Sequence, residues 1–519
     1  MLNKIFFLVF LSFSTIIFSQ EYKLTIYPDS GKYQISKHIY GHFSEHLGRL
    51  IYGGIWVGEN SSIPNKNGIR TDIVEALKKI KIPNLRWPGG CFADEYHWKD
   101  GIGPRNERPK TINTNWGGVI EDNSFGTHEF MDLCDQLGCE PVICGNIGSG
   151  TVEEMSDWVD YLTADNEGPM SKLRKKNGRE KPWKVKFWGM GNETWGCGGI
   201  MTSDFYADEM ARYSRFLRNN NDNVLYKIAS GGLEADYNWT ETIMKKWSST
   251  GGWLQGYLSG YSLHYYTVPH DWTNKGSATD FNEQDWFTTI FKTLRMDTLV
   301  TNHSAIMDKY DPQKRIGLIV DEWGDWHEVE PGTNPGFLYQ QNTLRDAMVA
   351  AINLNIFNKH CSRVKMANIA QIVNVLQALI LTDKEKMILT PTYHVFDLYK
   401  VHQDAIFLPF KLESEDYELD GKKIPSLHAT ASKDSNGLIH ISIVNVNPEK
   451  SLKVSCGIEG VTSKQISGKI LTSENMQDHN TFEQPDNVKI KEFNQFKIED
   501  DKILIDMPSK SIITLEIKD

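Results

Sequence analysis

Two glutamates each follow an apolar segment of the chain and are flanked by tryptophan and glycine. Glu193 comes after the segment Val185–Met190, and Glu322 comes after the apolar run at residues 316–320. A single glutamate at a strand end is more often structural or solvated than catalytic. Two of them in one aromatic, glycine-lined pocket could act as the acid and the nucleophile that cleave a glycosidic bond. The pair therefore predicts a sugar-cleaving site.

The elements that must position the two glutamates follow a repeated order of strand, glycine-containing loop and helix. About eight such units lie within residues 38–398, which predicts an α/β fold with a closed parallel (β/α)8 barrel of the TIM type. Side chains that do chemistry in this architecture lie at the C-terminal ends of the strands. Both Glu193 and Glu322 are placed there.

The pattern changes at about residue 399. Short alternating strands separated by Asn, Asp, Gly and Ser fill residues 399–519, which is typical of a β-sandwich, here jelly-roll-like. A strand within residues 20–37 has no helix after it, so we expect it to join the sandwich. A chain of 519 residues suits a large barrel with one appended module.

The composition excludes some classes of partner. The net charge is −11, whereas a nucleic acid or an anionic membrane requires a basic surface. We therefore expect no nucleic acid. The 15 Trp and 20 Tyr residues suit a neutral sugar, because aromatic faces stack on the apolar faces of sugar rings.

Residues 1–19 have the pattern of a secretory signal peptide, in which Lys4 precedes the mostly apolar run at residues 5–18. We expect a secreted or periplasmic protein with no membrane span after removal of the signal.

The seven cysteines do not suggest a disulfide framework. Their number is odd, and the spacing of Cys134, Cys139 and Cys144 does not match a common zinc site. Cys91 and Cys197 lie in glycine-rich loops, so we expect them to be pocket residues rather than a structural disulfide.

Several motifs in sequence order resemble the α-L-arabinofuranosidases of glycoside hydrolase family 51. They are residues 41–48 (Gly-His-Phe-Ser-Glu-His-Leu-Gly), 85–98, 191–199 (Gly-Asn-Glu-Thr-Trp-Gly-Cys-Gly-Gly) and 321–323 (Asp-Glu-Trp). The likeness covers roughly residues 35–400 and, more loosely, the sandwich. It implies release of terminal non-reducing α-L-arabinofuranosyl residues from arabinan, arabinoxylan or arabino-oligosaccharides. It also implies no metal or organic cofactor, and a homo-oligomer, often a hexamer.

The resemblance assigns roles to individual residues. Glu193 would be the general acid/base and Glu322 the nucleophile of a retaining hydrolase, whose carboxyl groups must lie about 5 to 5.5 Å apart. One acid must be protonated and the other ionised, so we expect a bell-shaped pH dependence. The implied substrate-binding residues are Glu45, Cys91, Asn192, His264, Tyr266 and Gln371, with Trp98 and Trp323 as aromatic walls. At the position of Cys91 the family carries Asn.

Three other functions compete with this one. The segment from His42 through Glu45 to His46 fits the H-x-x-E-H motif of zinc metallopeptidases, although glycines bracket it and it follows a strand. A non-catalytic sugar-binding protein would be expected to lack one of the two glutamates. An endo-β-glucanase or xylanase on the same barrel is the nearest alternative, and a panel of aryl glycosides separates it from an arabinofuranosidase.

Overall fold

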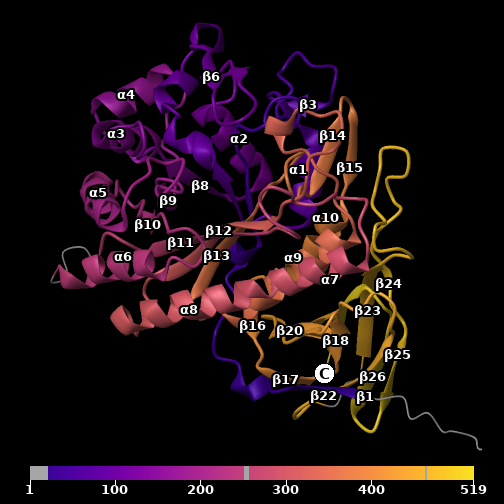
Figure 1. The fold of residues 1–519 in the computed structure, drawn as a ribbon. Coiled ribbons are helices and arrows are strands. Elements are labelled where there is room, and N and C mark those ends of the chain that lie inside the picture. The colour runs from indigo at the N-terminus through magenta and orange to yellow at the C-terminus, as the bar shows by residue number, and fades with distance from the viewer. Residues whose placement is uncertain (1–20, 251–255, 462–464, 519) are drawn as a thin grey trace, which may run out of the picture.

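A computed structural model describes residues 21–250, 256–461 and 465–518 and places them in a barrel and a sandwich (Figure 1). The predicted signal peptide lies outside these residues. Eight parallel strands close the barrel in the order β2-β5-β8-β9-β10-β11-β12-β13, which confirms the predicted (β/α)8 architecture. These strands are β2 Gly41–Phe43, β5 Asn84–Trp87, β8 Glu140–Gly145, β9 Phe187–Met190, β10 Tyr226–Ala229, β11 Gly260–Thr267, β12 Gly317–Asp325 and β13 Val364–Ile369.

Helices cover the outside of the barrel, each with its apolar side chains turned inward. α9 differs from the surface helices, because its residues 344–358 are buried on all sides. It lies between the barrel and the sandwich strand β20 (Figure 1), so it has no solvent face. The helices are α1 Thr71–Lys79, α2 Thr127–Leu137, α3 Val152–Thr163, α4 Pro169–Lys176, α5 Ser203–Phe216, α6 Tyr237–Ser249, α7 Glu283–Thr293, α8 Arg295–Tyr310, α9 Leu344–Lys359 and α10 Pro391–Tyr399.

The barrel strands also supply a small apolar cluster of their own. Five strands each contribute one buried side chain to it, namely Val142, Phe187, Ile228, Ile319 and Met366. Layers of this kind fill a barrel interior and leave the C-terminal ends of the strands for polar side chains. The site described below lies at those ends.

The sandwich consists of two antiparallel-rich sheets around a second core. β1 belongs to the first sheet, where it pairs with β17 antiparallel and with β22 parallel. The first sheet has the order β17-β1-β22-β26-β25 and the second the order β16-β20-β21-β27-β23-β24. The strands are β1 Glu21–Ile26, β16 Ile406–Phe407, β17 Phe410–Glu413, β20 Leu427–Lys433, β21 Ile439–Asn445, β22 Leu452–Ile458, β23 Gln465–Thr472, β24 Lys491–Glu492, β25 Phe496–Glu499, β26 Lys502–Met507 and β27 Ser511–Lys518.

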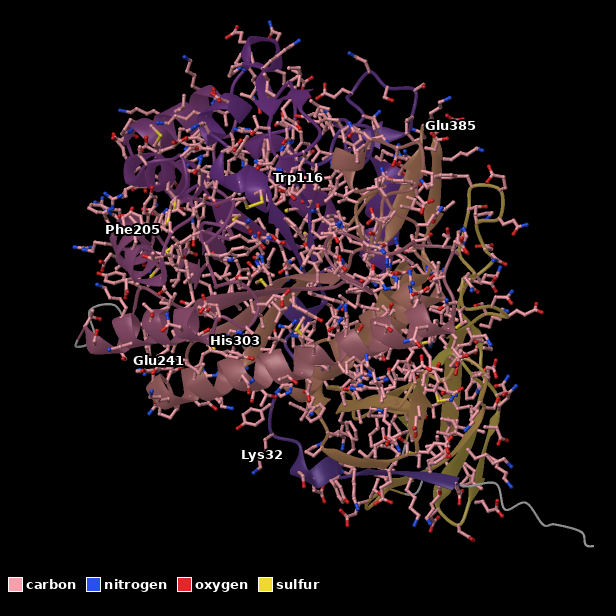
Figure 2. The ribbon with its side chains drawn as sticks, in the orientation of Figure 1. Lys32, Trp116, Phe205, Glu241, His303 and Glu385 are labelled. Carbon is pink, nitrogen blue, oxygen red and sulfur yellow. A yellow bond between two sulfur atoms is a disulfide. The ribbon has the colours of Figure 1, made fainter. Side chains whose placement is uncertain are left out.

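Short hairpins extend the loops of the barrel. One of them, formed by β6 (Thr111–Asn113) and β7 (Val119–Glu121), carries Trp116 at its turn, on the barrel side of the molecule away from the sandwich (Figure 2). The barrel loops also form the hairpins β3 Asn65–Lys66 with β4 Ile69–Arg70 and β14 Ile380–Asp383 with β15 Lys386–Leu389, whereas the hairpin of β18 Asp416–Leu419 with β19 Lys422–Pro425 lies between the sandwich strands β17 and β20.

Within the described ranges, no helix has both the length and the apolar content needed to cross a bilayer. The domain boundaries at residues 37/38 and 398/399 stay a prediction.

Candidate active site

Glu193 and Glu322 lie together at the C-terminal ends of the barrel strands. Glu193 follows β9, and Glu322 lies on β12. A carboxylate oxygen of Glu193 lies within 4.8 Å of a carboxylate oxygen of Glu322, and a ring nitrogen of His264 lies within 4.8 Å of both. This separation suits the retaining geometry, in which the two carboxyl groups lie about 5 to 5.5 Å apart.

The backbone after β9 turns sharply to present Glu193. Gly191 has φ +81°, and a Cβ there would lie 2.3 Å from Cγ2 of Ile147, so only glycine fits. Glu193 itself has φ +40°, in the left-handed region that few non-glycine residues adopt. Such strain is common at functional positions, where the surroundings must hold it in place.

Asp94 holds the backbone next to Glu193. Its Oδ2 accepts a hydrogen bond from the backbone N of Asn192 at 2.8 Å, and its Oδ1 accepts from the backbone N of Ile147 at 2.8 Å and of Gly148 at 3.0 Å. Burial raises the pKa of Asp94 to about 7, although these hydrogen bonds oppose the shift. The carboxyl group therefore joins the loops after β8 and β9.

Two donors fix the Glu322 carboxylate. Arg86 donates from Nη1 to Oε1 at 2.8 Å, and the Tyr266 hydroxyl donates to Oε2 at 2.9 Å. Arg86 also donates from Nη2 to Oδ1 of Asn192 at 2.6 Å, and the Asn192 amide nitrogen donates a long hydrogen bond to Sγ of Cys197 at 3.8 Å. Burial alone would lower the pKa of Arg86, but the charges of Asp321 and Glu322 are among the effects that outweigh it and raise the pKa.

His264 lies between three carboxyl groups. Its Nδ1 is 3.0 Å from Oε1 of Glu193 and 3.6 Å from Oε2 of Glu322, and its Nε2 is 3.3 Å from Oδ1 of Asp321. Burial alone would lower the pKa of the ring, but the surrounding carboxylates, Glu322 first, outweigh burial and raise the pKa of His264 from 6.5 to about 10. Both ring nitrogens face carboxylate oxygens, an arrangement that favours the imidazolium, in which each nitrogen donates.

A small cavity of about 160 Å³ adjoins the two glutamates. Glu45 lies at its wall and accepts hydrogen bonds from the Trp116 indole at 2.9 Å and from the Gln371 amide at 3.0 Å. Burial and the charge of Glu322 raise the pKa of Glu45 to about 7, although its hydrogen bonds oppose the shift. The residues that line the cavity are Glu45, Leu47, Gly90, Cys91, Trp116, Asn192, Glu193, Tyr266, Glu322, Trp326, Leu338, Gln371 and Leu376.

The structure corrects the expectation that Cys91 and Cys197 are not a disulfide. They are bonded to each other across 106 residues of sequence, with their Cα atoms 5.5 Å apart, because the loops after β5 and β9 meet at the barrel mouth. The Cys197 sulfur lies 3.8 Å from Oε2 of Glu193. Cys91 lines the small cavity, where its sulfur carries no hydrogen to donate.

The structure also shows that the prediction of Trp98 and Trp323 as aromatic walls is wrong. Trp98 is 1% exposed and stacks on Trp158, while Trp323 is 0% exposed and packs against Phe357. Both rings belong to the hydrophobic core. The aromatic walls of the cavity are instead Trp116 and Trp326.

The three residues of the metallopeptidase motif do not converge on one point. His42 packs against Phe396, and His46 Nδ1 lies 3.3 Å from a carboxylate oxygen of Glu121. Glu45 faces the small cavity. The motif begins in strand β2 rather than in a helix, so it cannot present two histidines on one helical face.

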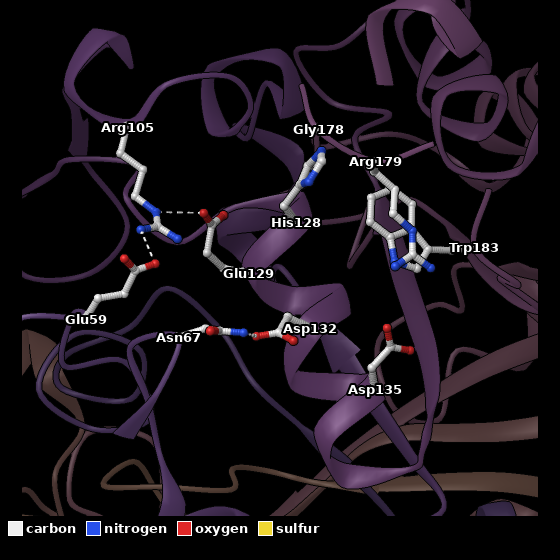
Figure 3. Close-up of a pocket in the computed structure, with 10 residues that line it drawn as sticks. All are labelled: Glu59, Asn67, Arg105, His128, Glu129, Asp132, Asp135, Gly178, Arg179 and Trp183. Carbon is white, nitrogen blue, oxygen red and sulfur yellow. Dashed lines mark hydrogen bonds and ion pairs between the residues drawn. The ribbon is translucent and has the colours of Figure 1, made fainter. Parts of the chain in front are cut away.

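A second hollow, of about 310 Å³, lies beside α2 and contains none of the predicted site residues (Figure 3). Its charged side chains are largely engaged with one another. Arg105 pairs with Glu59 at 2.9 Å and with Glu129 at 2.8 Å, and Arg179 lies over the ring of Trp183. This hollow therefore offers no arrangement comparable to the Glu193 and Glu322 pair.

Several residues of the site were not predicted from the sequence. Arg86 and Asp94 lie within the motif at residues 85–98, and Asp321 precedes Glu322, so their positions in the quoted motifs were available signals. Trp116 and Trp326 carry no such signal, because each reaches the cavity from a loop.

Comparisons with known proteins agree with this geometry. A family model described as α-L-arabinofuranosidase 1 domain matches residues 76–284, and one described as α-L-arabinofuranosidase C-terminal domain matches residues 321–511. An intracellular exo-α-L-arabinofuranosidase of Bacteroides ovatus is 53% identical, over 95% of each chain. A probable α-L-arabinofuranosidase C of Aspergillus niger is 31% identical, over 88% of this chain and 90% of the other.

Solved structures of arabinofuranosidases are also similar to this chain. The family 51 arabinofuranosidase of Xanthomonas axonopodis pv. citri is 47% identical with a TM-score of 0.94, covering 96% of this chain and all of the other. A bifunctional glucanase-xylanase from a metagenome library is 11% identical with a TM-score of 0.60, covering 96% of this chain and 99% of the other, and shares the fold alone. The endo-acting alternative is therefore not favoured. The chain belongs to the α-L-arabinofuranosidases of glycoside hydrolase family 51.

Proposed function

We propose that the protein releases terminal non-reducing α-L-arabinofuranosyl residues from arabinan, arabinoxylan or arabino-oligosaccharides with retention of configuration. The observation that carries this proposal is the closeness of Glu193 and Glu322 beside a cavity for one sugar. Glu45 and Gln371 line that cavity, and the Gln371 amide donates to the Glu45 carboxylate at 3.0 Å.

The chemistry assigns one role to each glutamate. Glu322, held by Arg86 and Tyr266, attacks the anomeric carbon and forms an ester. The proton of Glu193 passes to the departing oxygen in the same step. Glu193 then takes a proton from water, which attacks the same carbon and releases arabinose.

The surrounding residues bind and orient the sugar in this proposal. Asn192 directs its amide nitrogen, whose other contact is the Cys197 sulfur at 3.8 Å, to the 2-hydroxyl, and Glu45 and Gln371 bind other ring hydroxyls. Trp116 and Trp326 cover the apolar face of the ring. Together these contacts place the anomeric carbon next to Glu322.

We propose that residues 1–19 direct export of the protein. The relative from Bacteroides ovatus is named intracellular, so the two could differ in compartment. Fractionation of the native host with an antibody tests this proposal. Recovery in the periplasm or medium, with a mature N-terminus near residue 20, is the expected result, whereas a full-length protein confined to the cytoplasm contradicts it.

The homo-oligomer stays a prediction.

Azide distinguishes the roles of the two glutamates. Glu193→Ala is expected to slow cleavage of methyl α-L-arabinofuranoside by about 10² to 10⁴-fold, because the leaving group loses its proton donor. With a dinitrophenyl arabinofuranoside, which needs no such proton, azide should accelerate the variant and yield the α-azide, identified by NMR. Glu322→Ala should yield the β-azide, because azide then replaces the nucleophile. The opposite pair of products would exchange the two roles.

The charge of His264 can be measured directly. Its pKa of about 10 in the folded state predicts that the ring is an imidazolium at pH 8, where an ordinary histidine is neutral. The raised pKa stabilises the fold fully below about pH 6.5, and this stabilisation is lost as the pH rises through about 10. ¹⁵N NMR of histidine-labelled protein, assigned with His264→Gln, reports the ring state. A neutral ring at pH 8 would contradict the arrangement.

A further inference from the structure

A second cavity of the active site, distinct from the hollow beside α2, adjoins the small cavity at the acid/base residue Glu193. It has a volume of about 380 Å³, against about 160 Å³ for the small cavity. Glu193, Tyr266 and Trp326 line both. Glu193 protonates the oxygen that joins the two parts of a substrate, so the part that leaves must lie in the second cavity when arabinose occupies the first. This step rests on the proposed function.

Loops after four consecutive barrel strands form the walls of the second cavity. Trp195 follows β9, Leu233 follows β10, Trp272 follows β11 and Trp326 follows β12. Trp272 is 52% exposed and Leu233 is 51% exposed, which is unusual for side chains of this size. Their exposure leaves apolar surface free for a ligand.

The aromatic rings of the cavity are arranged in sequence outward from the catalytic residues. Tyr266 meets Trp326 edge to face at 5.1 Å between ring centroids, and Trp326 meets Trp272 edge to face at 5.5 Å. Tyr266 in turn donates to Glu322. A chain of sugars that leaves the small cavity would therefore pass Trp326 first and Trp272 next.

Hydrogen bonds fix the loop that carries Trp272. Asp271 accepts from the backbone N of Thr273 at 2.7 Å and of Asn274 at 3.0 Å. Lys275 donates its backbone N to Glu328 at 2.9 Å and its Nζ to the carbonyl oxygen of Trp272 at 3.0 Å. The exposed ring is thus held in place before a ligand binds, which lowers the entropic cost of binding.

The cavity is almost neutral beyond the catalytic residues. Glu234 is its other acid, and Arg295 pairs with it at 3.0 Å. A charged leaving group would find no free partner there. Neutral sugar rings fit better, since their C–H faces stack on aromatic rings while their hydroxyls stay hydrated.

We infer that the second cavity binds the leaving group as a neutral oligosaccharide of at least two pentose units, with Trp272 as the platform for the unit farther from the cleaved bond. Trp272 then determines preference for oligosaccharides over simple arabinosides. A leaving group of this kind is supplied either by a linear α-1,5-linked arabinan or by a xylan backbone that carries arabinose.

The test compares Trp272→Ala with wild type on two kinds of substrate. kcat/KM should fall about tenfold for α-1,5-linked arabinotriose or for arabinosylated xylotriose, because a stacking contact is lost. It should stay within about twofold for methyl α-L-arabinofuranoside, whose methanol leaving group has no ring to stack on Trp272. Trp272→Phe should recover most of the loss. The oligosaccharide with the larger loss identifies the backbone that the cavity accepts.

Phe205→Ala is the matched control. Phe205 is 54% exposed on α5 (Figure 2). It is not among the lining residues of either cavity, so its removal should leave the cleavage of both kinds of substrate unaffected. An unchanged kcat/KM on both oligosaccharides for Trp272→Ala would overturn the inference. An equal loss on the methyl glycoside, or a changed molecular mass by light scattering, would also overturn it, because Trp272 would then support the fold or a subunit contact.

A binding measurement separates this inference from the proposed function. Calorimetric titration of arabinotriose into Glu322→Gln, with and without Trp272→Ala, does not require turnover. Binding about tenfold weaker without Trp272 supports the cavity, and equal binding overturns it. A wild-type enzyme that cleaves neither kind of arabinofuranoside would overturn the proposed function, and the titration would still decide the use of the cavity.

Discussion

The whole site depends on two buried cations that allow several carboxyl groups to lie together. Arg86 and His264 face Asp321 and Glu322 from different strands. Burial alone would raise the pKa of Asp321, but Arg86 and His264 outweigh it and lower the pKa. Loss of either cation would leave buried negative charges uncompensated, which is strongly unfavourable. The charge of Glu322 is also one of the causes, after burial, that raise the pKa of Glu45.

The barrel supplies these groups from separate strands at fixed register. His264 on β11 pairs with Glu322 on β12, and Phe43 on β2 pairs with Arg86 on β5. Gly90 leaves room for the carboxylates, since a Cβ there would lie 3.2 Å from carboxylate oxygens of both Glu45 and Glu322, a tight contact that would require them to shift. The Cys91–Cys197 disulfide joins the two loops that border the cavity. The backbone of the barrel strands and their loops therefore determines the positions of the catalytic side chains.

Much of this arrangement could be predicted because it depends on local patterns in the amino-acid sequence. The alternation of strand and helix indicates the barrel, and apolar runs that end in Glu193 and Glu322 indicate the catalytic edge. The aromatic walls could not be assigned in this way. Trp98 and Trp323 lie within the motifs but their side chains are buried in the core, and the tryptophan rings that reach the cavity come from loops whose paths depend on tertiary packing.

The disulfide was missed for a related reason. Sequence spacing says little about two cysteines whose loops meet only when the barrel closes. The buried cations show a further limit, since Arg86 lies within a recognised motif but its partners Asn192 and Glu322 are distant in sequence. Sequence motifs identify the catalytic residues more readily than they identify the residues that stabilise them.

Covalent trapping tests the central claim most directly. Glu193→Ala lacks the base that activates water, so a dinitrophenyl arabinofuranoside should leave the sugar attached to the enzyme. Mass spectrometry is expected to show the added mass of one arabinosyl group on the peptide that contains Glu322. A label on another carboxylate, such as Asp321 or Glu45, would contradict the account.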